Sequence, residues 1–362
     1  MRFRLRPLRT GATHAAVAAA LTVGLVAAGC SSNDSGSASP ASSAAAGQST
    51  LKVTIATSKG SLPGLPMIVA QEEGFFAKHG LDAELITSLR GGAAIMSALS
   101  SGSAQIVAQT VSAAAQAKQK GATDPVIASL SGGVPYVLVV GKKFASVPNA
   151  TAGENGWQAT IKALKGATIS AAGPGTAFDV ILKALFKQAG LSESDFANIN
   201  IQHGGSEVAA LKSGQVDASL VDIGNALSLV SDAGGRTVMD LAKQGPSWVT
   251  NQAWSGFLSS DKVLKAHPDL TEKFAGVMAD VRKFYQDPAN IKELHRIAVN
   301  VSGIPDHPDL DNALRQYVGL MLPAFSTAQV QTTIDFMVDS GQLKQTPQVK
   351  PADIVVASAL SA

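Results

Sequence analysis

The chain has 362 residues, of which 46% are hydrophobic and 15% charged. It is therefore too apolar for a disordered protein and long enough for two domains. The formal net charge is +2, but without the four arginines in residues 2–9, 25 basic side chains face 27 acidic ones, a net charge of −2. A nearly neutral body without basic runs argues against nucleic acid as a partner. The single cysteine excludes internal disulfides and multi-cysteine metal sites.

The N-terminus has the pattern of an export signal. A basic segment at 2–9 precedes an uncharged apolar run at 15–28. This run of fourteen residues is typical of a secretory signal and shorter than the roughly 20 residues of a membrane span. Ala28 and Gly29 stand directly before Cys30 and resemble a bacterial lipobox, although Ala27 replaces the usual Leu or Val. We expect a signal peptide at 1–29 and a lipid on Cys30; ordinary secretion and a retained anchor are the alternatives.

Residues 31–50 contain fifteen Ser, Ala or Gly in twenty positions. Such a composition predicts a flexible tether with an end-to-end reach of about 25 Å. We therefore expect residues 30–50 to hold an extracytoplasmic body, starting near Leu51, on the membrane surface.

One supersecondary unit is repeated in the body. Each copy has a strand, a Gly-rich loop, a helix, a second strand, a short helix and a third strand. The spacing agrees between the copies: Phe76–Leu81 matches Phe186–Leu191, and Leu99–Gly102 matches Leu211–Gly214. Strands that alternate with helices through short loops predict parallel sheets with right-handed crossovers, and hence two α/β lobes.

The remaining segments decide how the lobes are connected. Strand candidates lie at 125–140 and 251–260, and from Asp261 onward apolar residues follow helical spacing. If these last helices pack on the first lobe, the chain crosses between the lobes twice. We therefore expect lobe one at 51–142 plus 243–362 and lobe two at 143–242, with a ligand cleft and a hinge between them.

The cleft walls should be the loops at the carboxyl ends of the parallel strands, where ligands bind in open α/β sheets. No GxSxG, HExxH or phosphate-binding GK[ST] motif is present, and the histidines lack ligand spacing. We therefore expect no catalytic residue, cofactor or metal. The candidate ligand-binding residues are Ser58, Leu62, Pro63, Arg90, Gly91, Gly92, Ala93, Gln109, Thr110, Gly173, Pro174, Gly175, Thr176, Asp222, Trp248, Asn251 and Trp254.

Two glycine-rich helix starts are the strongest of these candidates. Gly173, Gly175 and Thr176 follow a strand and open a helix, an arrangement that offers free N–H groups to an anion or serves only as a cap. Arg90 opens the counterpart in lobe one, where it binds a sulfonate or carboxylate in a bidentate way or is solvated at the rim. Asp222 suits an amine of the ligand or caps a helix.

Gln109 and Thr110 follow the third strand of the first copy. The repeat places this position at the cleft, so we expect both residues to face it. Trp248 and Trp254 lie in the return segment, where they belong to the core or form a wall that stacks on the ligand.

Several stretches together resemble a known family: VTIATSKGSLPGLPMIVAQEEGFFAKHGLDAELI, RGGAAIMSALSSGSAQIV, LKGATISAAGPGTAFDVILKALFKQAGL and ALKSGQVDASLVD. They are similar to substrate-binding proteins of ABC importers for aliphatic sulfonates, taurine, nitrate and pyrimidine precursors, over roughly residues 51–357. The resemblance implies an α/β, two-lobed periplasmic-binding-protein fold with two interlobe crossings, and docking on a permease driven by an ATPase. It also implies ligand contacts at Gly175 and Thr176, and at Gly92 and Ala93 on the opposite lobe. The cysteine-rich signature of the pyrimidine-synthase branch is missing after Cys30.

We therefore expect a monomeric solute-binding lipoprotein, anchored outside the cytoplasm, that captures an alkanesulfonate or taurine-like anion. Nitrate, bicarbonate or a neutral pyrimidine that stacks on Trp248, Trp254 or Phe178 is the alternative ligand. A lipid-anchored enzyme and a receptor for a membrane sensor are the alternatives from other classes.

Overall fold

The computed structural model describes residues 50–89, 91–173, 175–201 and 204–361. The expected signal peptide, Cys30, the tether up to residue 49, Arg90 and Pro174 lie outside the described residues. Among the described residues, no helix has the length and apolar character needed to cross a membrane.

The first sheet is mixed and has the strand order β2-β1-β3-β10-β4. The strands β1, β2 and β3 are parallel, and β10 runs antiparallel to both β3 and β4. Every residue of β4 and β10 is buried, as expected for strands covered on both faces. The strands span Leu51–Ala56 (β1), Leu81–Ile86 (β2), Ile106–Thr110 (β3), Val126–Gly132 (β4) and Ala253–Ser259 (β10).

The second sheet has the order β7-β6-β8-β5-β9 and reproduces the same arrangement. Here β6 lies between its parallel neighbours β7 and β8, as β1 lies between β2 and β3. The internal repeat predicted from the sequence is thus confirmed by the strand order. The strands span Tyr136–Val140 (β5), Thr168–Ser170 (β6), Ala197–Ile199 (β7), Ala218–Asp222 (β8) and Arg236–Asp240 (β9).

The chain passes from the first sheet to the second at residues 133–135 and returns through α9 (Leu241–Gln244) and α10 (Ser247–Thr250). The two passages lie side by side, since the Gly133 N–H donates to the Gln252 carbonyl at 2.8 Å and the Val134 N–H to the Val249 carbonyl at 3.2 Å. The sequence predicts residues up to 142 in lobe one, and this prediction is corrected for one strand. β5 pairs with β8 and β9 and therefore belongs to the second sheet.

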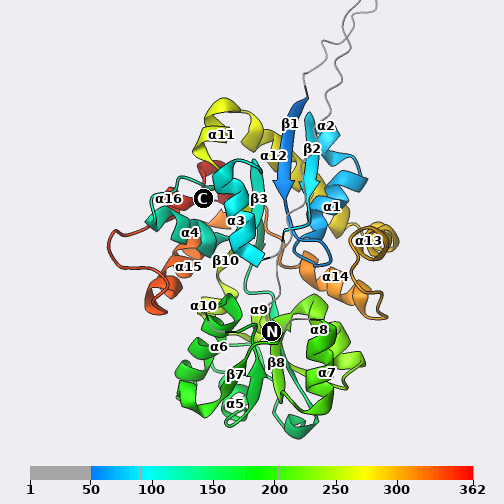
Figure 1. Cartoon of the computed structure of the whole chain (residues 1–362), viewed down its shortest axis with the longest axis vertical. Coiled ribbons are helices and arrows are strands. Elements are labelled where there is room, and N and C mark those ends of the chain that lie inside the picture. Colours follow the sequence, from blue (N-terminus) through cyan, green and yellow to red (C-terminus); the bar gives the residue numbers. More distant parts are fainter. Residues whose placement is uncertain (1–49, 90, 174, 202–203, 362) are drawn as a thin grey trace, which may run out of the picture. The chain divides into compact units, whose positions relative to one another are not determined.

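The helices of the two repeats flank their sheets (Figure 1). In the first copy they are α1 (Leu65–Glu72), α2 (Phe75–Lys78), α3 (Gly91–Ser101) and α4 (Val111–Gln119). In the second copy and its lead-in they are α5 (Gln158–Lys162), α6 (Ala177–Gln188), α7 (Gly205–Ser213) and α8 (Ile223–Ser231).

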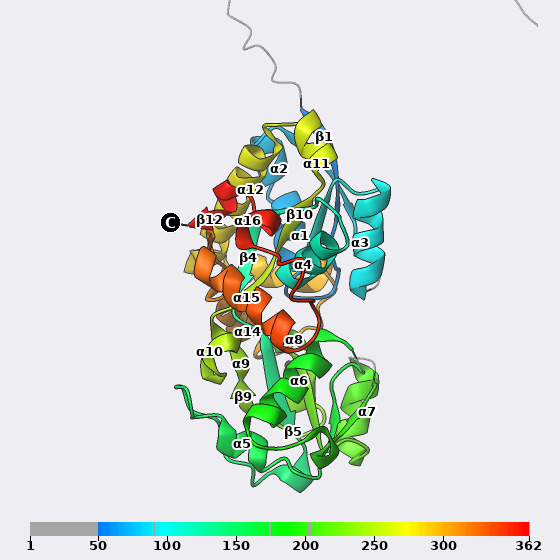
Figure 2. The same ribbon diagram turned by 90° about the vertical axis from the view of Figure 1, so that its left-hand side faces the viewer.

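The C-terminal helices bury their apolar faces mainly against the first sheet (Figures 1 and 2). Phe274 of α12 packs on Phe257 of β10 with ring centroids 5.0 Å apart. Helix α15 packs on α4 and β10, whereas α14 also contacts α8 beside the second sheet. The elements are α11 (Asp261–Ala266), α12 (Leu270–Gln286), α13 (Ile291–Arg296), α14 (Leu310–Val318), α15 (Thr327–Asp339) and α16 (Pro351–Ile354), with the short strands β11 (Phe325–Ser326) and β12 (Leu360–Ser361).

Candidate ligand cleft

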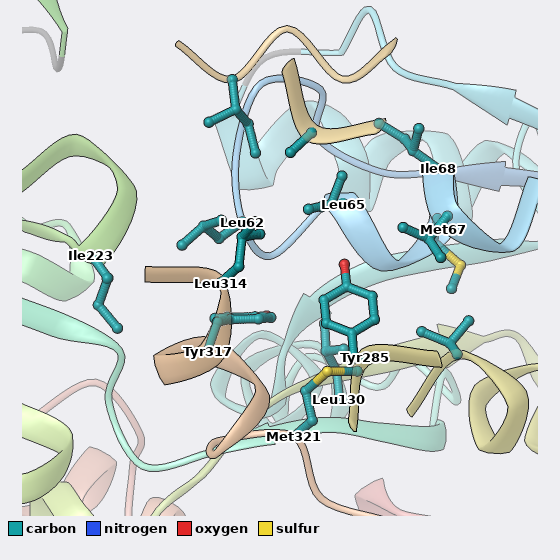
Figure 3. Packing of buried hydrophobic residues seen from close by; sticks show 14 of the residues in the cluster. Leu62, Leu65, Met67, Ile68, Leu130, Ile223, Tyr285, Leu314, Tyr317 and Met321 are labelled. Atoms are coloured by element: carbon teal, nitrogen blue, oxygen red, sulfur yellow. The ribbon is translucent and has the colours of Figure 1, made fainter. Parts of the chain in front are cut away.

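Leu62 marks the place where the two halves of the repeat meet. It lies in the loop after β1, is 2% exposed, and packs in one apolar cluster with Ile223 of α8 and Tyr317 of α14. A Cβ atom placed on Gly224 would be 3.5 Å from Leu62 Cγ. Figure 3 shows Leu62 above Leu314 and Tyr317, with Ile223 to their left. The loop after β1 and the start of α8 therefore face each other, as the ends of parallel strands should in a ligand cleft.

The first-lobe wall is held by Gln109 at the end of β3. Its Nε2 donates to the Gly92 carbonyl at 3.2 Å, and its Oε1 accepts from the Thr110 N–H at 2.9 Å. A Cβ on Gly92 would lie 3.0 Å from Gln109 Nε2, so an added methyl group would push against the end of the Gln109 side chain. Thr110 caps α4 by accepting from the Ala113 N–H at 3.2 Å. Gln109 thus fixes the start of α3 against β3.

The start of α6 in the second lobe carries a carboxylate of its own. Asp179, only 2% exposed, accepts from the Gly175 N–H at 2.8 Å and from Asn198 Nδ2 at 2.6 Å. Lys183 Nζ lies 3.2 Å from the same carboxylate. The Thr176 hydroxyl donates to the carbonyls of Ala171 and Gly173 and accepts from the Asp179 N–H. The polar groups expected to receive an anion here are therefore already engaged within the chain.

Asp222 caps α8 at the end of β8. Its carboxylate accepts from the Asn225 N–H at 3.1 Å and from the Asn225 side-chain amide. Tyr136 is its cross-strand partner on β5. Burial raises the pKa of the Tyr136 phenol and of the Tyr317 phenol, and the Asp222 charge adds to both shifts, whereas a hydrogen bond with Ser131 lowers the pKa of Tyr317. Tyr317 lies on α14, which packs against α8, the helix that Asp222 caps.

An aromatic group lies next to this carboxylate. Tyr136 stacks on Phe178 of α6 with ring centroids 3.9 Å apart and planes at 9°, and it meets Trp254 edge to face at 5.2 Å. Trp254 is 8% exposed and Tyr136 7%, so both rings are nearly buried. These contacts join the second sheet, the start of α6 and the return strand β10.

The family is decided by a comparison with protein-family models. The model described as NMT1/THI5 like matches residues 64–289, more than half of the chain. The chain belongs to the NMT1/THI5-like family. No curated protein sequence matches it.

Solved structures of this kind have the same fold. The alkanesulfonate-binding protein SsuA from Xanthomonas axonopodis pv. citri, bound to MOPS, is 16% identical over 88% of this chain and 99% of its own, with a TM-score of 0.61. The aliphatic sulphonate binding protein SsuA from Escherichia coli is 14% identical over 83% and 95%, with a TM-score of 0.64. The nitrate-binding protein NrtA from Synechocystis PCC 6803 is 14% identical over 84% and 85%, with a TM-score of 0.62. The two sheets thus form the two lobes of a periplasmic-binding-protein fold.

In this NMT1/THI5-like chain the predicted residues fall into separate groups. Trp248 stacks on Phe336 at 4.5 Å, and its Nε1 donates to Gln188 at 2.7 Å. With Asn251 and Gly175 it lines a groove of about 1310 Å³ between α6 and α15. Asp222 and Trp254 belong instead to the aromatic group around Tyr136. The remaining residues lie at strand ends and helix starts: Ser58, Leu62 and Pro63 in the loop after β1, Gly91, Gly92 and Ala93 in the first turn of α3, Gln109 and Thr110 as the last residues of β3, and Gly173 and Thr176 in the turn after β6.

Sequence reasoning missed Tyr136 and Tyr317. Tyr136 opens β5 directly after the first crossing, behind Gly133 and Pro135, so a signal was present in the turn residues before an apolar strand. Tyr317 follows the helical spacing of α14 and therefore carries the pattern of an ordinary core residue. In the described part of the chain, no group of three or more His, Cys, Asp or Glu side chains could hold a metal ion.

Proposed function

We propose that this chain is the extracytoplasmic solute-binding component of an ABC importer. It captures a small organic anion, an aliphatic sulfonate or taurine-like compound, in the cleft between its lobes and delivers it to a membrane permease that an ATPase drives. Within this proposal the chain binds and releases its solute without chemical turnover. It works as a monomer and is held at the membrane by the lipid on Cys30.

The observation that carries the proposal is the contact between a strand end of the first repeat, after β1, and a strand end of the second, after β8. The loop after β1 reaches α8 through Leu62 and Gly224, so both lobes contribute to one solute site. The crossings at Gly133–Gln252 and Val134–Val249 are joined by backbone hydrogen bonds and form a hinge. A solute that contacts both lobes binds the closed form better than the open form and shifts the population towards it.

The anionic group of the solute is best placed at the first lobe. The starts of α6 and α8 already carry the carboxylates of Asp179 and Asp222. The start of α3 instead offers the exposed residues Gly91, Gly92 and Ala93. Helix N–H groups with the positive end of the helix dipole stabilise an anion, and the predicted role of Arg90 adds a cation.

A thermal-shift titration of residues 30–362 with Cys30→Ser tests the proposal. At constant ionic strength, the panel contains taurine, ethanesulfonate, nitrate, bicarbonate and a pyrimidine. A ligand that binds only the folded state adds about 2.7 kcal/mol at a hundredfold excess over Kd. A saturable shift with a sulfonate, weakened by Arg90→Ala, supports the proposal. A shift only with nitrate, bicarbonate or the pyrimidine overturns the sulfonate assignment, and a flat panel overturns the proposed solute class.

A further inference from the structure

We propose that Asp222 is a specificity-determining residue whose carboxylate binds an ammonium group of the solute. The solute would then carry both an acidic group and an amine, as an aminoalkanesulfonate does. This inference rests on the proposed function and specifies which members of the proposed solute class the cleft accepts.

Asp222 stands out among the aspartates of the second lobe because no cation pairs with it. Four other aspartates there are buried or half-buried, and each has a lysine within ion-pair distance. Asp222 is half-buried as well, but of the described residues only Asn225 donates hydrogen bonds to it, and no Lys, Arg or His forms an ion pair with it. The four pairs are Asp179–Lys183 at 3.2 Å, Asp195–Lys165 at 3.1 Å, Asp217–Lys143 at 3.0 Å and Asp240–Lys243 at 3.2 Å.

A carboxylate withdrawn from water without a cation is unfavourable unless a partner compensates it. Two oxygens accept about four hydrogen bonds, and Asn225 supplies two. Asp222 therefore keeps capacity for further donors. Because it lies where Leu62 of the first lobe approaches Gly224, a group bound to it would also be enclosed when the lobes close.

Two phenols lie on elements next to Asp222. Tyr136 is its cross-strand partner on β5, and Tyr317 lies on α14, which packs against α8, the helix that Asp222 caps. Both side chains are buried, with Tyr136 7% and Tyr317 1% exposed. The Tyr317 hydroxyl forms a hydrogen bond with Ser131, and a hydroxyl that donates one hydrogen bond can still accept another.

An ammonium group matches this set of acceptors. It has three N–H donors, which two phenol oxygens and a carboxylate can receive. The stacked rings of Tyr136 and Phe178 add an aromatic surface beside the charge, and aromatic faces attract cations. An acidic group of the solute, such as a sulfonate or carboxylate, would instead be repelled by the Asp222 charge at this position.

Titration calorimetry with taurine and ethanesulfonate tests the inference, because the two probes differ by one ammonium group. We expect the unaltered protein to bind taurine at least tenfold more tightly than ethanesulfonate. Asp222→Asn should remove most of this preference, weakening taurine at least tenfold and leaving ethanesulfonate unchanged or tighter. Asn is as good a helix cap as Asp, so the variant should keep α8. The matched control is Asp232→Asn on the exposed end of the same helix, which should change neither affinity.

Equal affinity of the unaltered protein for both probes would overturn the inference and leave the proposed function intact. A taurine preference that persists in Asp222→Asn would also overturn it. Asp222→Ser provides a second cap if the Asn variant does not fold, and the comparison of the two probes on the unaltered protein needs no variant. If neither sulfonate binds the unaltered protein, both the inference and the proposed solute class are wrong.

Discussion

The carboxylate of Asp179 accepts a hydrogen bond from the backbone N–H of Gly175, 2.8 Å away, and so folds back over the start of its own helix. Lys183 one turn later and Asn198 of β7 complete its partners. A negative group in the first turn stabilises a helix through the dipole, and here that position is filled by the chain itself. The glycine-rich turn before α6 therefore serves the fold first.

Asp179→Asn should lower the free energy of unfolding by about 1–3 kcal/mol, because it removes the charge of a buried carboxylate that accepts from the Gly175 N–H and pairs with Lys183. Chemical denaturation without solute measures this loss. The control Glu193→Gln removes the other, 70% exposed, partner of Lys183 and should change the value by less than about 0.5 kcal/mol. Equal losses in both variants would contradict the role given to Asp179.

Gly133→Ala should destabilise the crossing between the lobes. Gly133 has φ +66°, and an added Cβ would lie 3.2 Å from the Thr250 carbonyl oxygen on the neighbouring crossing. The matched control is Gly303→Ala, where φ is +77° and nothing lies within 4 Å of the new atom. Both variants bear roughly 1–2 kcal/mol of left-handed strain. Denaturation should show a larger loss for Gly133→Ala, and an equal loss would mean that the close approach of the crossings is unimportant.

The stability of the first lobe should decrease slightly as the pH rises past neutrality. Hydrogen bonding to Asp311, at 2.7 Å from Nδ1, and to Asp306 raises the pKa of His295. A pKa raised by folding adds stability that is complete below the unfolded value near 6.5 and is lost as the pH rises through the folded value. Thermal unfolding between pH 6 and 9, at low salt, should show a decline that is smaller in His295→Asn. A decline of the same size in the variant would assign it to other groups.

Cys30→Ser should move the protein from the membrane to the soluble fraction, because the proposed anchor is the lipid on that thiol. Detergent phase partitioning of whole-cell extracts measures the change. Ser31→Ala next to it is the control and should leave the protein in the detergent phase. A Cys30→Ser protein that still partitions with detergent would favour a retained anchor.

The strand order could be predicted because the repeat encodes it locally. The segments Phe76–Leu81 and Phe186–Leu191 mark the end of a helix in both copies. The next strand begins at Leu81 in the first copy and at Ala197, after a further short turn, in the second. The same reasoning could not assign β5 to a sheet, because its run of apolar residues suits either one. Only its pairing with β8 and β9 shows that it belongs to the second sheet. Strand pairing across a long loop leaves little trace in local periodicity.

The candidate site was predictable in its loops but not in its partners. Thr176 was expected to cap α6, and its contact with the Asp179 N–H bears this out. The return of the Asp179 side chain to Gly175 could have been suspected from the spacing of Thr176 and Asp179, which resembles a capping box. The lack of a cation at Asp222 could not have been predicted from the sequence. Ion pairs in this lobe join residues as far apart in the chain as Lys143 and Asp217, and local spacing does not show such pairs. Ligand roles for the predicted cleft residues remain predictions.

The paired crossings between the lobes limit how the protein could adapt to solutes of different size. Two adjacent peptide segments that share backbone hydrogen bonds bend together more easily than they slide past each other. The lobes would then rotate as rigid bodies about one hinge axis. Longer solutes would be accommodated by a wider angle at the mouth, while the spacing near Tyr136 and Trp254, close to that axis, would stay almost constant.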